Sequence, residues 1–136
     1  MASGKYALKD APVDYKQLWV DLLCVYTNLT DIDIESLELD TENLPVDTFR
    51  QEFLETIDCW GPNDLAKVAT FADDVILRKV PPLVHNAGFL VDGYHRIGAC
   101  FWVGRLKLPA IDISKVVAVH ESIRRWGEKT HSNRLA

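Results

Sequence analysis

The chain has 136 residues, 48% of them hydrophobic and 26% charged, and its formal net charge at pH 7 is −5. This length and mixture fit one soluble globular domain, so we expect a single domain over residues 1–136. The longest apolar stretch, residues 18–29, contains Asp21 and is too short to span a bilayer. We therefore expect no membrane segment, and the first ten residues lack the apolar run of a secretory signal.

The charges are unevenly distributed along the chain. Ten acidic residues face the single Arg50 over residues 31–58, whereas eleven Lys or Arg face seven Asp or Glu from Cys59 onward. The second half can therefore attract a phosphate or a limited stretch of nucleic acid, although the whole surface is unlike that of a dedicated duplex binder. We interpret the acidic run as a solvated surface rather than a metal site.

Three cysteines, Cys24, Cys59 and Cys100, form no CxxC pair and are odd in number. This fits neither a disulfide framework nor a structural zinc site, so we expect a cytoplasmic protein without a His/Cys metal site. Each cysteine is expected to be a small buried hydrophobic residue.

The first half of the chain predicts two helices and a strand. Asp14 can cap a helix over residues 15–29, where apolar residues recur with helical spacing. Apolar and acidic residues then alternate over 32–39, which favours a half-buried strand. A second helix is expected from its cap at Asp47 to the breaker at 59–62.

The second half predicts a third helix over 63–77, ended before Pro81-Pro82, and then a hairpin. Its strands, 83–85 and 89–91, flank the turn-forming residues 86–88. A short helix follows from Asp92 to Gly104, and residues 108–113 are expected to return as a strand. The tail, 114–136, is expected to hold a short helix with a loose end.

The turn Asp92-Gly93-Tyr94-His95-Arg96 carries the chemistry that the sequence suggests. A strand that enters a helix through glycine exposes the N–H groups of the first helical turn and lets an anion approach. An arginine adds a planar fork for phosphate oxygens, and a histidine adds a donor whose charge responds to a ligand. Asp92 can cap the helix or take part in catalysis.

Together with Ala99, the Pro81-Pro82 entry and the Leu-Pro-Ala-Ile-Asp-Ile strand, this turn resembles the ParB/sulfiredoxin superfamily. The resemblance covers residues 80–113, and over 32–77 only the order of strand and helices fits. It implies a small α+β fold with N-terminal helices and a mixed sheet that includes a strand-turn-helix-strand phosphate-binding segment. It also implies that Gly93, His95 and Arg96 contact a nucleotide phosphate.

Departures from the family pattern narrow the expected activity. Sulfiredoxins carry their reactive cysteine where this chain has Tyr94, and a phenol is no thiolate nucleophile at neutral pH. Cys100 is expected on the apolar face of the helix, poorly placed to substitute. Chromosome-partition ParB proteins have a glutamate and a second arginine in this turn, and the chain lacks room for their other domains.

The stand-alone branch of the superfamily remains, which includes nucleases and NTPases, free-serine kinases and plasmid fertility-inhibition factors that limit conjugative DNA transfer. We expect a protein of the last type that binds ATP or another purine nucleotide and hydrolyses NTP or DNA phosphodiester bonds with Mg²⁺. Its partners would be the nucleotide, single-stranded or plasmid DNA, or a DNA-transfer protein. Alternatives are a non-catalytic inhibitor that uses the acidic 31–58 face, and a serine-type kinase.

Phosphoryl chemistry also needs groups outside the arginine fork. The candidate catalytic residues are Asp92, His95 and Arg96, and Lys79 could reach a phosphate. Tyr94 could stack on the nucleotide base, whereas three tryptophans are expected in the core: Trp19, Trp60 and Trp102. The acids that could join Asp92 at a magnesium ion are Glu35, Glu38, Asp40 and Glu42.

Overall fold

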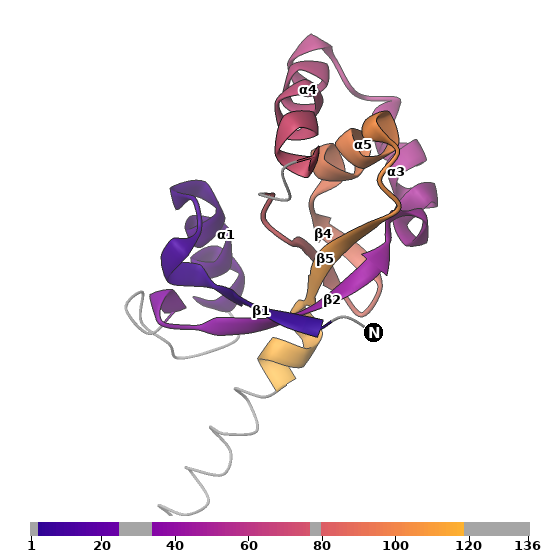
Figure 1. Ribbon diagram of the computed structural model, residues 1–136. Coiled ribbons are helices and arrows are strands. Elements are labelled where there is room, and N and C mark those ends of the chain that lie inside the picture. The colour runs from indigo at the N-terminus through magenta and orange to yellow at the C-terminus, as the bar shows by residue number, and fades with distance from the viewer. Residues whose placement is uncertain (1–2, 25–33, 77–79, 119–136) are drawn as a thin grey trace, which may run out of the picture. The chain divides into compact units, whose positions relative to one another are not determined.

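The computed structural model describes residues 3–24, 34–76 and 80–118. The chain divides into two compact units. The first consists of Met1–Tyr6 and Asp40–Asp112, and the second of Ala7–Leu39 and Ile113–Ala136. Figure 1 shows the elements along the chain. Among the described residues, none of the helices has both the length and the apolar content that crossing a membrane requires.

A five-stranded mixed sheet organises the chain. Its strands are β1 (Ser3–Ala7), β2 (Glu38–Pro45), β3 (Leu83–Asn86), β4 (Phe89–Asp92) and β5 (Lys107–Asp112), in the order β1-β2-β5-β3-β4. β5 pairs antiparallel with β2, with Glu42 opposite Ala110, and parallel with β3, with Val84 opposite Ile111. The predicted α+β class and the mixed sheet are therefore confirmed.

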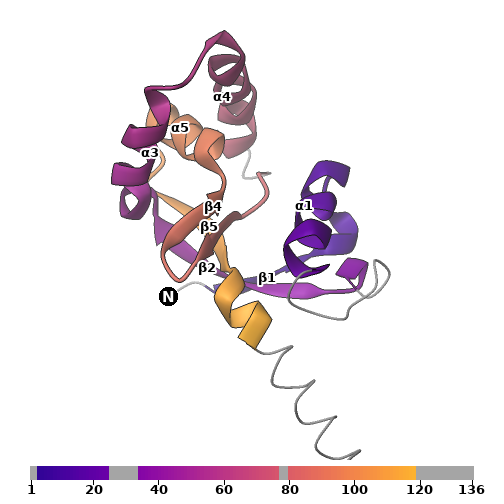
Figure 2. The same ribbon diagram turned by 180° about the vertical axis from the view of Figure 1, so that it is seen from behind.

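Three helices of the first unit lie together on one side of these strands, as Figures 1 and 2 show. They are α3 (Arg50–Ile57), α4 (Pro62–Ile76) and α5 (Tyr94–Val103), and the 3-10 turn η2 (Val46–Phe49) leads into α3. Their apolar faces meet the strands in one core, because Phe53, Val68 and Ile97 pack with Leu83 and Leu108. The predicted hairpin, turn, helix and strand over 83–113 are all present.

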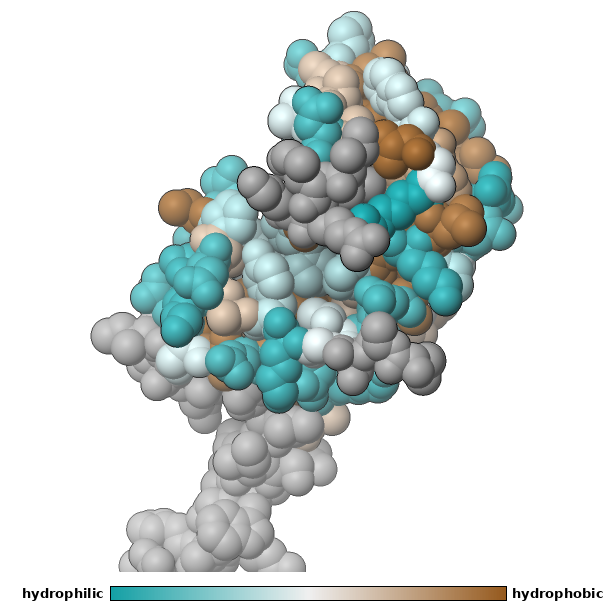
Figure 3. All heavy atoms as spheres, viewed as in Figure 1, coloured by the Kyte–Doolittle hydropathy of each residue, from teal (hydrophilic) through white to brown (hydrophobic). Residues whose placement is uncertain are grey.

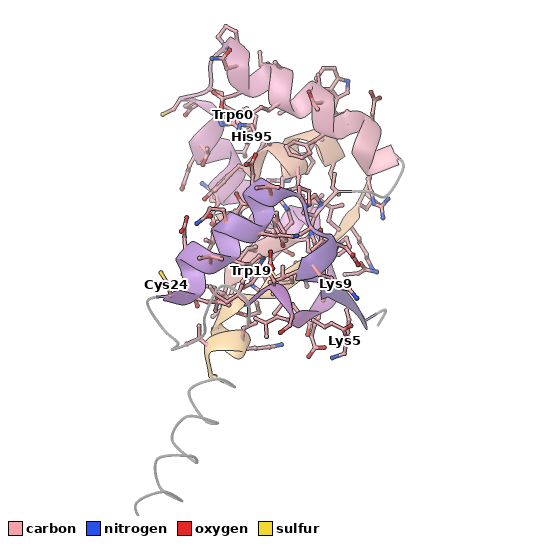
Figure 4. The ribbon with its side chains drawn as sticks, turned by 90° about the vertical axis from the view of Figure 1, so that its left-hand side faces the viewer. Lys5, Lys9, Trp19, Cys24, Trp60 and His95 are labelled. Atoms are coloured by element: carbon pink, nitrogen blue, oxygen red, sulfur yellow. The ribbon has the colours of Figure 1, made fainter. Side chains whose placement is uncertain are left out.

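The second unit contains η1 (Leu8–Asp10), α1 (Val13–Cys24) and a helical segment over residues 113–118. Its fully buried residues include Leu8, Trp19 and Leu23, and Trp19 is labelled in Figure 4. α1 confirms the first predicted helix up to Cys24, while residues 25–29 of that prediction lie outside the described residues. The predicted tail helix lies outside them beyond residue 118.

The predicted strand over 32–39 was wrong in position. Residues 34–35 are helical, residues 32–33 lie outside the described part, and β2 begins only at Glu38. Within β2, Leu39 and Thr41 are buried while their neighbours Glu38, Asp40 and Glu42 are exposed, so the expected alternation is real but lies further along. Pairing of β2 with β5 fixes this position, and local alternation does not reveal such a distant partner.

Predictions for four other residues need correction. Asp47 does not cap α3, because its carboxylate bonds the Nε of Arg50 instead. Trp102 is 65% exposed rather than buried. Figure 3 shows hydrophobic residues interspersed with polar ones on the surface of the first unit. Cys24 and Cys59 are also exposed, and only Cys100 is buried.

A side chain of α3 forms a hydrogen bond with the outer strand of the sheet. Glu52 of α3 accepts a hydrogen bond from the Leu90 N–H of β4 at 2.8 Å, across 38 residues of sequence. β4 is the last strand in the sheet order, and Phe89 and Val91 on it are exposed. A helix carboxylate therefore satisfies one backbone donor of the outer strand.

The hairpin between β3 and β4 closes through a two-residue turn, Ala87-Gly88, in which both φ angles are positive, at 50° and 101°. The Gly88 N–H donates to His85 Nδ1 at 3.0 Å, and the Ala87 N–H donates to Asp112 Oδ1 at 3.0 Å. Positive φ at both positions defines a type I′ turn, for which Asn-Gly is the preferred pair. Ala87 is therefore the strained member of an otherwise well-bonded turn.

Replacing Ala87 with asparagine is expected to raise the free energy of unfolding by about 0.5–1 kcal/mol, because asparagine tolerates the left-handed region better than alanine. Replacing it with valine is expected to lower it, because a β-branched residue fits that region worst. Urea unfolding followed by circular dichroism measures both changes. Equal stability of the two variants would contradict the turn assignment.

Candidate functional site

The predicted phosphate-binding turn lies where β4 passes through Gly93 into α5. Gly93 has φ 124° and is the N-cap of α5, where as a glycine it has no side chain to cap the helix. The first intrahelical bond runs from the Ile97 N–H to the Gly93 carbonyl, at 2.9 Å. The N–H groups before Ile97 belong to the first turn, which an α-helix leaves without intrahelical partners.

Gly93 is required by the close packing of the turn against β3. A Cβ at this position would lie 2.4 Å from Leu83 Cδ2 and 3.6 Å from Arg96 Cζ. The space that glycine leaves is thus filled by a fully buried leucine of β3. The missing side chain thus makes room for Leu83, and the expected contact of Gly93 with a phosphate stays a prediction.

Arg96 lies inside the unit and bonds to its own chain. The side chain is 6% exposed, and Nη1 donates to the carbonyl oxygens of Pro81 and Pro82, at 2.7 and 2.5 Å. Nη2 donates to Asp92 Oδ2. The guanidinium therefore links the segment before β3 to the end of β4 and supports the turn from its buried side.

Asp92 and Tyr94 flank the glycine. The Asp92 side chain is 40% exposed and receives the Arg96 guanidinium. Tyr94 is half-buried against the core, and its hydroxyl donates to the Leu90 carbonyl at 3.4 Å, back along β4. Asp92 thus presents part of its carboxylate at the surface, while the Tyr94 hydroxyl is directed back toward β4.

His95, in the first turn of α5, joins two residues from the start of α4. Its Nε2 is 2.9 Å from Asp64 Oδ1. The ring stacks on Trp60, with ring centroids 4.9 Å apart and planes 9° from parallel. Figure 4 shows Trp60 and His95 side by side. The His95 and Asp64 side chains are 27% and 31% exposed, so this cluster lies at the surface of the unit.

Asp64 also closes the start of α4. Gly61, Pro62 and Asp64 form a helix beginning in which the Asp64 carboxylate accepts the Gly61 N–H at 2.9 Å. A proline in the first helical position and an acid two residues later are favourable there. The hydrogen bond from Gly61, and after it the bond from His95, holds the pKa of Asp64 below its ordinary value of 3.8.

This lowered pKa predicts a pH dependence of stability. The folded state lowers the pKa of the Asp64 carboxyl. The stabilisation from Asp64 is therefore fully present above its unfolded pKa of about 3.9. It is lost as the pH falls through the lower, folded pKa. The melting temperatures of wild type and Asp64→Asn should differ most at neutral pH and converge as the pH falls below the unfolded pKa and through the folded one. A difference that stays constant with pH would contradict this.

The other predicted site residues belong to parts of the chain other than the turn. Lys79 lies outside the described residues. Glu35 and Glu38 belong to the second unit, whereas Asp40 and Glu42 lie on β2 in the first. Lys5 bonds Asp40 at 2.9 Å, and Lys5 is labelled in Figure 4. Within residues 3–24, 34–76 and 80–118, no group of three or more His, Cys, Asp or Glu side chains could hold a metal ion.

Cys100 is placed as expected. It is fully buried on the core face of α5, and burial raises the pKa of its thiol to about 11. A thiol in this state is not the nucleophile that a sulfiredoxin reaction needs.

Asp64 and Trp60 are the site residues that sequence reasoning missed. They precede His95 by more than 30 residues, and only the packing of α4 on α5 brings them to it. The available signal was the helix beginning Trp60-Gly61-Pro62-Asn63-Asp64, in which an acid at the third helical position is directed back toward the N-cap. That pattern locates the carboxylate but does not reveal its histidine partner.

Comparisons of the chain with protein-family models, curated proteins and solved structures found no match. The resemblance to the ParB/sulfiredoxin superfamily therefore stays a prediction from the 92–96 turn and its flanking elements.

Proposed function

We propose that this chain is a ParB/sulfiredoxin-like nucleotide-binding protein that hydrolyses a phosphoryl or phosphodiester bond, with the phosphate at the first turn of α5. The supporting observation is that α5 begins directly after a hairpin strand, with Gly93 as an N-cap that has no side chain to bond the first-turn N–H groups. First-turn N–H groups and the positive end of the helix dipole favour an anion there. His95 in the same turn is the proton-transfer residue of the proposal.

Arg96 takes a different role from the one first expected. Its bonds to Pro81, Pro82 and Asp92 make it a residue that shapes the phosphate turn rather than one that grips the phosphate. The ligand is then held by backbone N–H groups, and His95 acts in proton transfer. In this proposal Gly93 and His95 stay part of the phosphate site, and the role of Arg96 changes from phosphate contact to support of the turn.

Magnesium would bind at this site only together with the nucleotide. A magnesium ion commonly uses one or two protein carboxylates together with phosphate oxygens and water. Asp92, 40% exposed beside Gly93, is the carboxylate that would hold it. When bound, the ion would neutralise phosphate charge during hydrolysis.

The test combines binding and turnover with the full chain. ATP and adenosine are compared by isothermal titration calorimetry with Mg²⁺ present, and hydrolysis is followed with ATP, single-stranded DNA and plasmid DNA. We expect ATP to bind at least about tenfold tighter than adenosine, because the phosphates are the anchor. His95→Gln should lower turnover about 10²-fold or more, as loss of a proton-transfer group does.

Lys107→Gln is the matched control, since it removes an exposed charge on β5, a strand that is not part of the turn. It should leave binding and turnover unchanged. Equal binding of ATP and adenosine would overturn the phosphate site. Turnover that His95→Gln leaves intact would overturn the hydrolytic role of that residue.

A second candidate is a non-catalytic inhibitor of DNA transfer on the same fold. The commitment of the Arg96 guanidinium to its own chain favours it, because an enzyme of this type would have an arginine free for the transferred phosphoryl group. If wild type and His95→Gln are equally inert in vitro and equally block plasmid transfer in cells, the inhibitor explains the data. Formation of phosphoserine from ATP and serine would instead indicate a kinase.

A further inference from the structure

We propose that Asp64 and Trp60 are positioning residues for His95, which fix its ring with the proton on Nε2 and the lone pair on Nδ1. The catalytic use of that lone pair rests on the function proposed above. The fixing of the ring does not, since it depends only on contacts between the beginnings of α4 and α5. Neither Asp64 nor Trp60 is part of the sequence pattern from which the turn was predicted.

The first step of the argument is the direction of the hydrogen bond. An ionised carboxylate only accepts hydrogen bonds, so the contact at 2.9 Å requires that His95 Nε2 carries the hydrogen. Asp64 remains ionised at neutral pH because its other oxygen accepts the Gly61 N–H, which lowers its pKa. A neutral imidazole has one protonated nitrogen, so Nδ1 is then the basic atom.

The second step is that the ring cannot rotate freely. Trp60 covers one face of the imidazole in a near-parallel stack. Trp60 is itself fixed, because Phe53 meets it edge-on at 5.5 Å between centroids. Gly98 of α5 also lies against it, where an added Cβ would be 3.3 Å from Trp60 Cη2. A ring bonded at Nε2 and stacked on a fixed indole keeps Nδ1 in one direction.

The third step is the chemistry that such a ring performs. In hydrolysis, Nδ1 removes a proton from water while the water oxygen forms its bond to phosphorus and the bond from phosphorus to the leaving oxygen breaks. The Asp64 carboxylate stabilises the imidazolium that forms, and the proton then passes to the leaving oxygen. The reaction consumes one water and needs no oxidant or further reactant. Carboxylate, imidazole and attacking oxygen thus form a relay of the type found in hydrolytic triads.

The direct test is to determine which nitrogen of the His95 ring carries the proton. Two-bond ¹H–¹⁵N correlation spectra of the full chain report which histidine nitrogen carries the proton, and His95→Gln assigns the signal. We expect wild-type His95 to show the Nε2–H form alone at neutral pH. Asp64→Ala should show both forms, whereas the control Asp73→Asn, an exposed acid further along α4, should match wild type.

Kinetics separate positioning from binding. Asp64→Asn is expected to lower kcat about 10²-fold with KM changed less than about twofold, since it removes charge stabilisation and leaves phosphate contacts in place. Trp60→Leu should lower kcat about tenfold, and Trp60→Phe should restore most of it because a flat ring again covers the imidazole. Asp64→Asn also serves as the more conservative variant if Asp64→Ala does not fold.

The two proposals fail differently. A wild-type ring protonated on Nδ1, or a ring unchanged in Asp64→Ala, overturns the positioning role whether or not the protein hydrolyses anything. A ring that behaves as expected in a protein that neither binds ATP nor turns it over supports the positioning role and overturns the proposed function.

Discussion

Gly93→Ala is expected to lower the free energy of unfolding by roughly 3 kcal/mol. Two costs combine. At φ 124° an L residue is strained, and the new Cβ would lie 2.4 Å from Leu83 Cδ2. Leu83 is fully buried in the core of the unit, so it has little room to retreat. Urea unfolding monitored by circular dichroism measures the loss.

A matched glycine separates the two costs. Gly88 has φ 101°, and an added Cβ there would meet no atom within 4 Å, so Gly88→Ala should carry the strain without the clash. The double variant Leu83→Ala/Gly93→Ala should cost less than the sum of its single changes, because the smaller side chain removes the clash. If the two glycine variants were equally destabilised and the double variant additive, close packing on Leu83 would not be why glycine is required.

Arg96→Lys is expected to cost about 2–4 kcal/mol of folding free energy. Lysine keeps the charge, but a single ammonium group cannot reproduce the planar fork that bonds Pro81, Pro82 and Asp92 together. Buried carbonyl oxygens that lose such donors cost about 1–3 kcal/mol each, and the partly exposed Asp92 adds less. Thermal and urea unfolding report this loss directly.

Arg50→Lys is the control for Arg96→Lys. Arg50 is exposed, pairs with Asp47 and lies 4.9 Å above the Phe101 ring, so its replacement should change stability by less than about 1 kcal/mol. If Arg96→Lys were as stable as wild type but bound ATP far more weakly, Arg96 would be a ligand contact. That result would return it to the role that the family pattern implies.

Local chemistry made the second half of the fold predictable. Gly88, Gly93 and Gly104 mark the turn, the helix start and the helix end, and each has the positive φ that glycine tolerates, whereas Ala87 has one that alanine disfavours. β1 was not predicted, and β2 was predicted too early. Their positions depend on pairing with strands distant in the sequence, such as Leu44 with Leu108, which local alternation cannot specify.

The candidate site was predictable only along one element. Gly93, His95 and Arg96 follow one another in a turn, so their proximity is fixed by sequence. The direction of each side chain is not, because Arg96 points inward to the proline carbonyls and His95 toward Asp64. The packing of α4 on α5 decides those directions, and it depends on how the apolar faces of the two helices fit together.

The hydrogen bond from Leu90 to Glu52 also affects how copies of this chain behave in a crowded solution. An outer strand with unpaired N–H groups and exposed apolar side chains is a template on which another chain can form a further strand. β4 carries Phe89 and Val91 at its surface, yet the Leu90 donor is already bonded to Glu52. An incoming strand would have to displace the Glu52 carboxylate from the Leu90 N–H. This hydrogen bond therefore disfavours fibre-like self-assembly through β4.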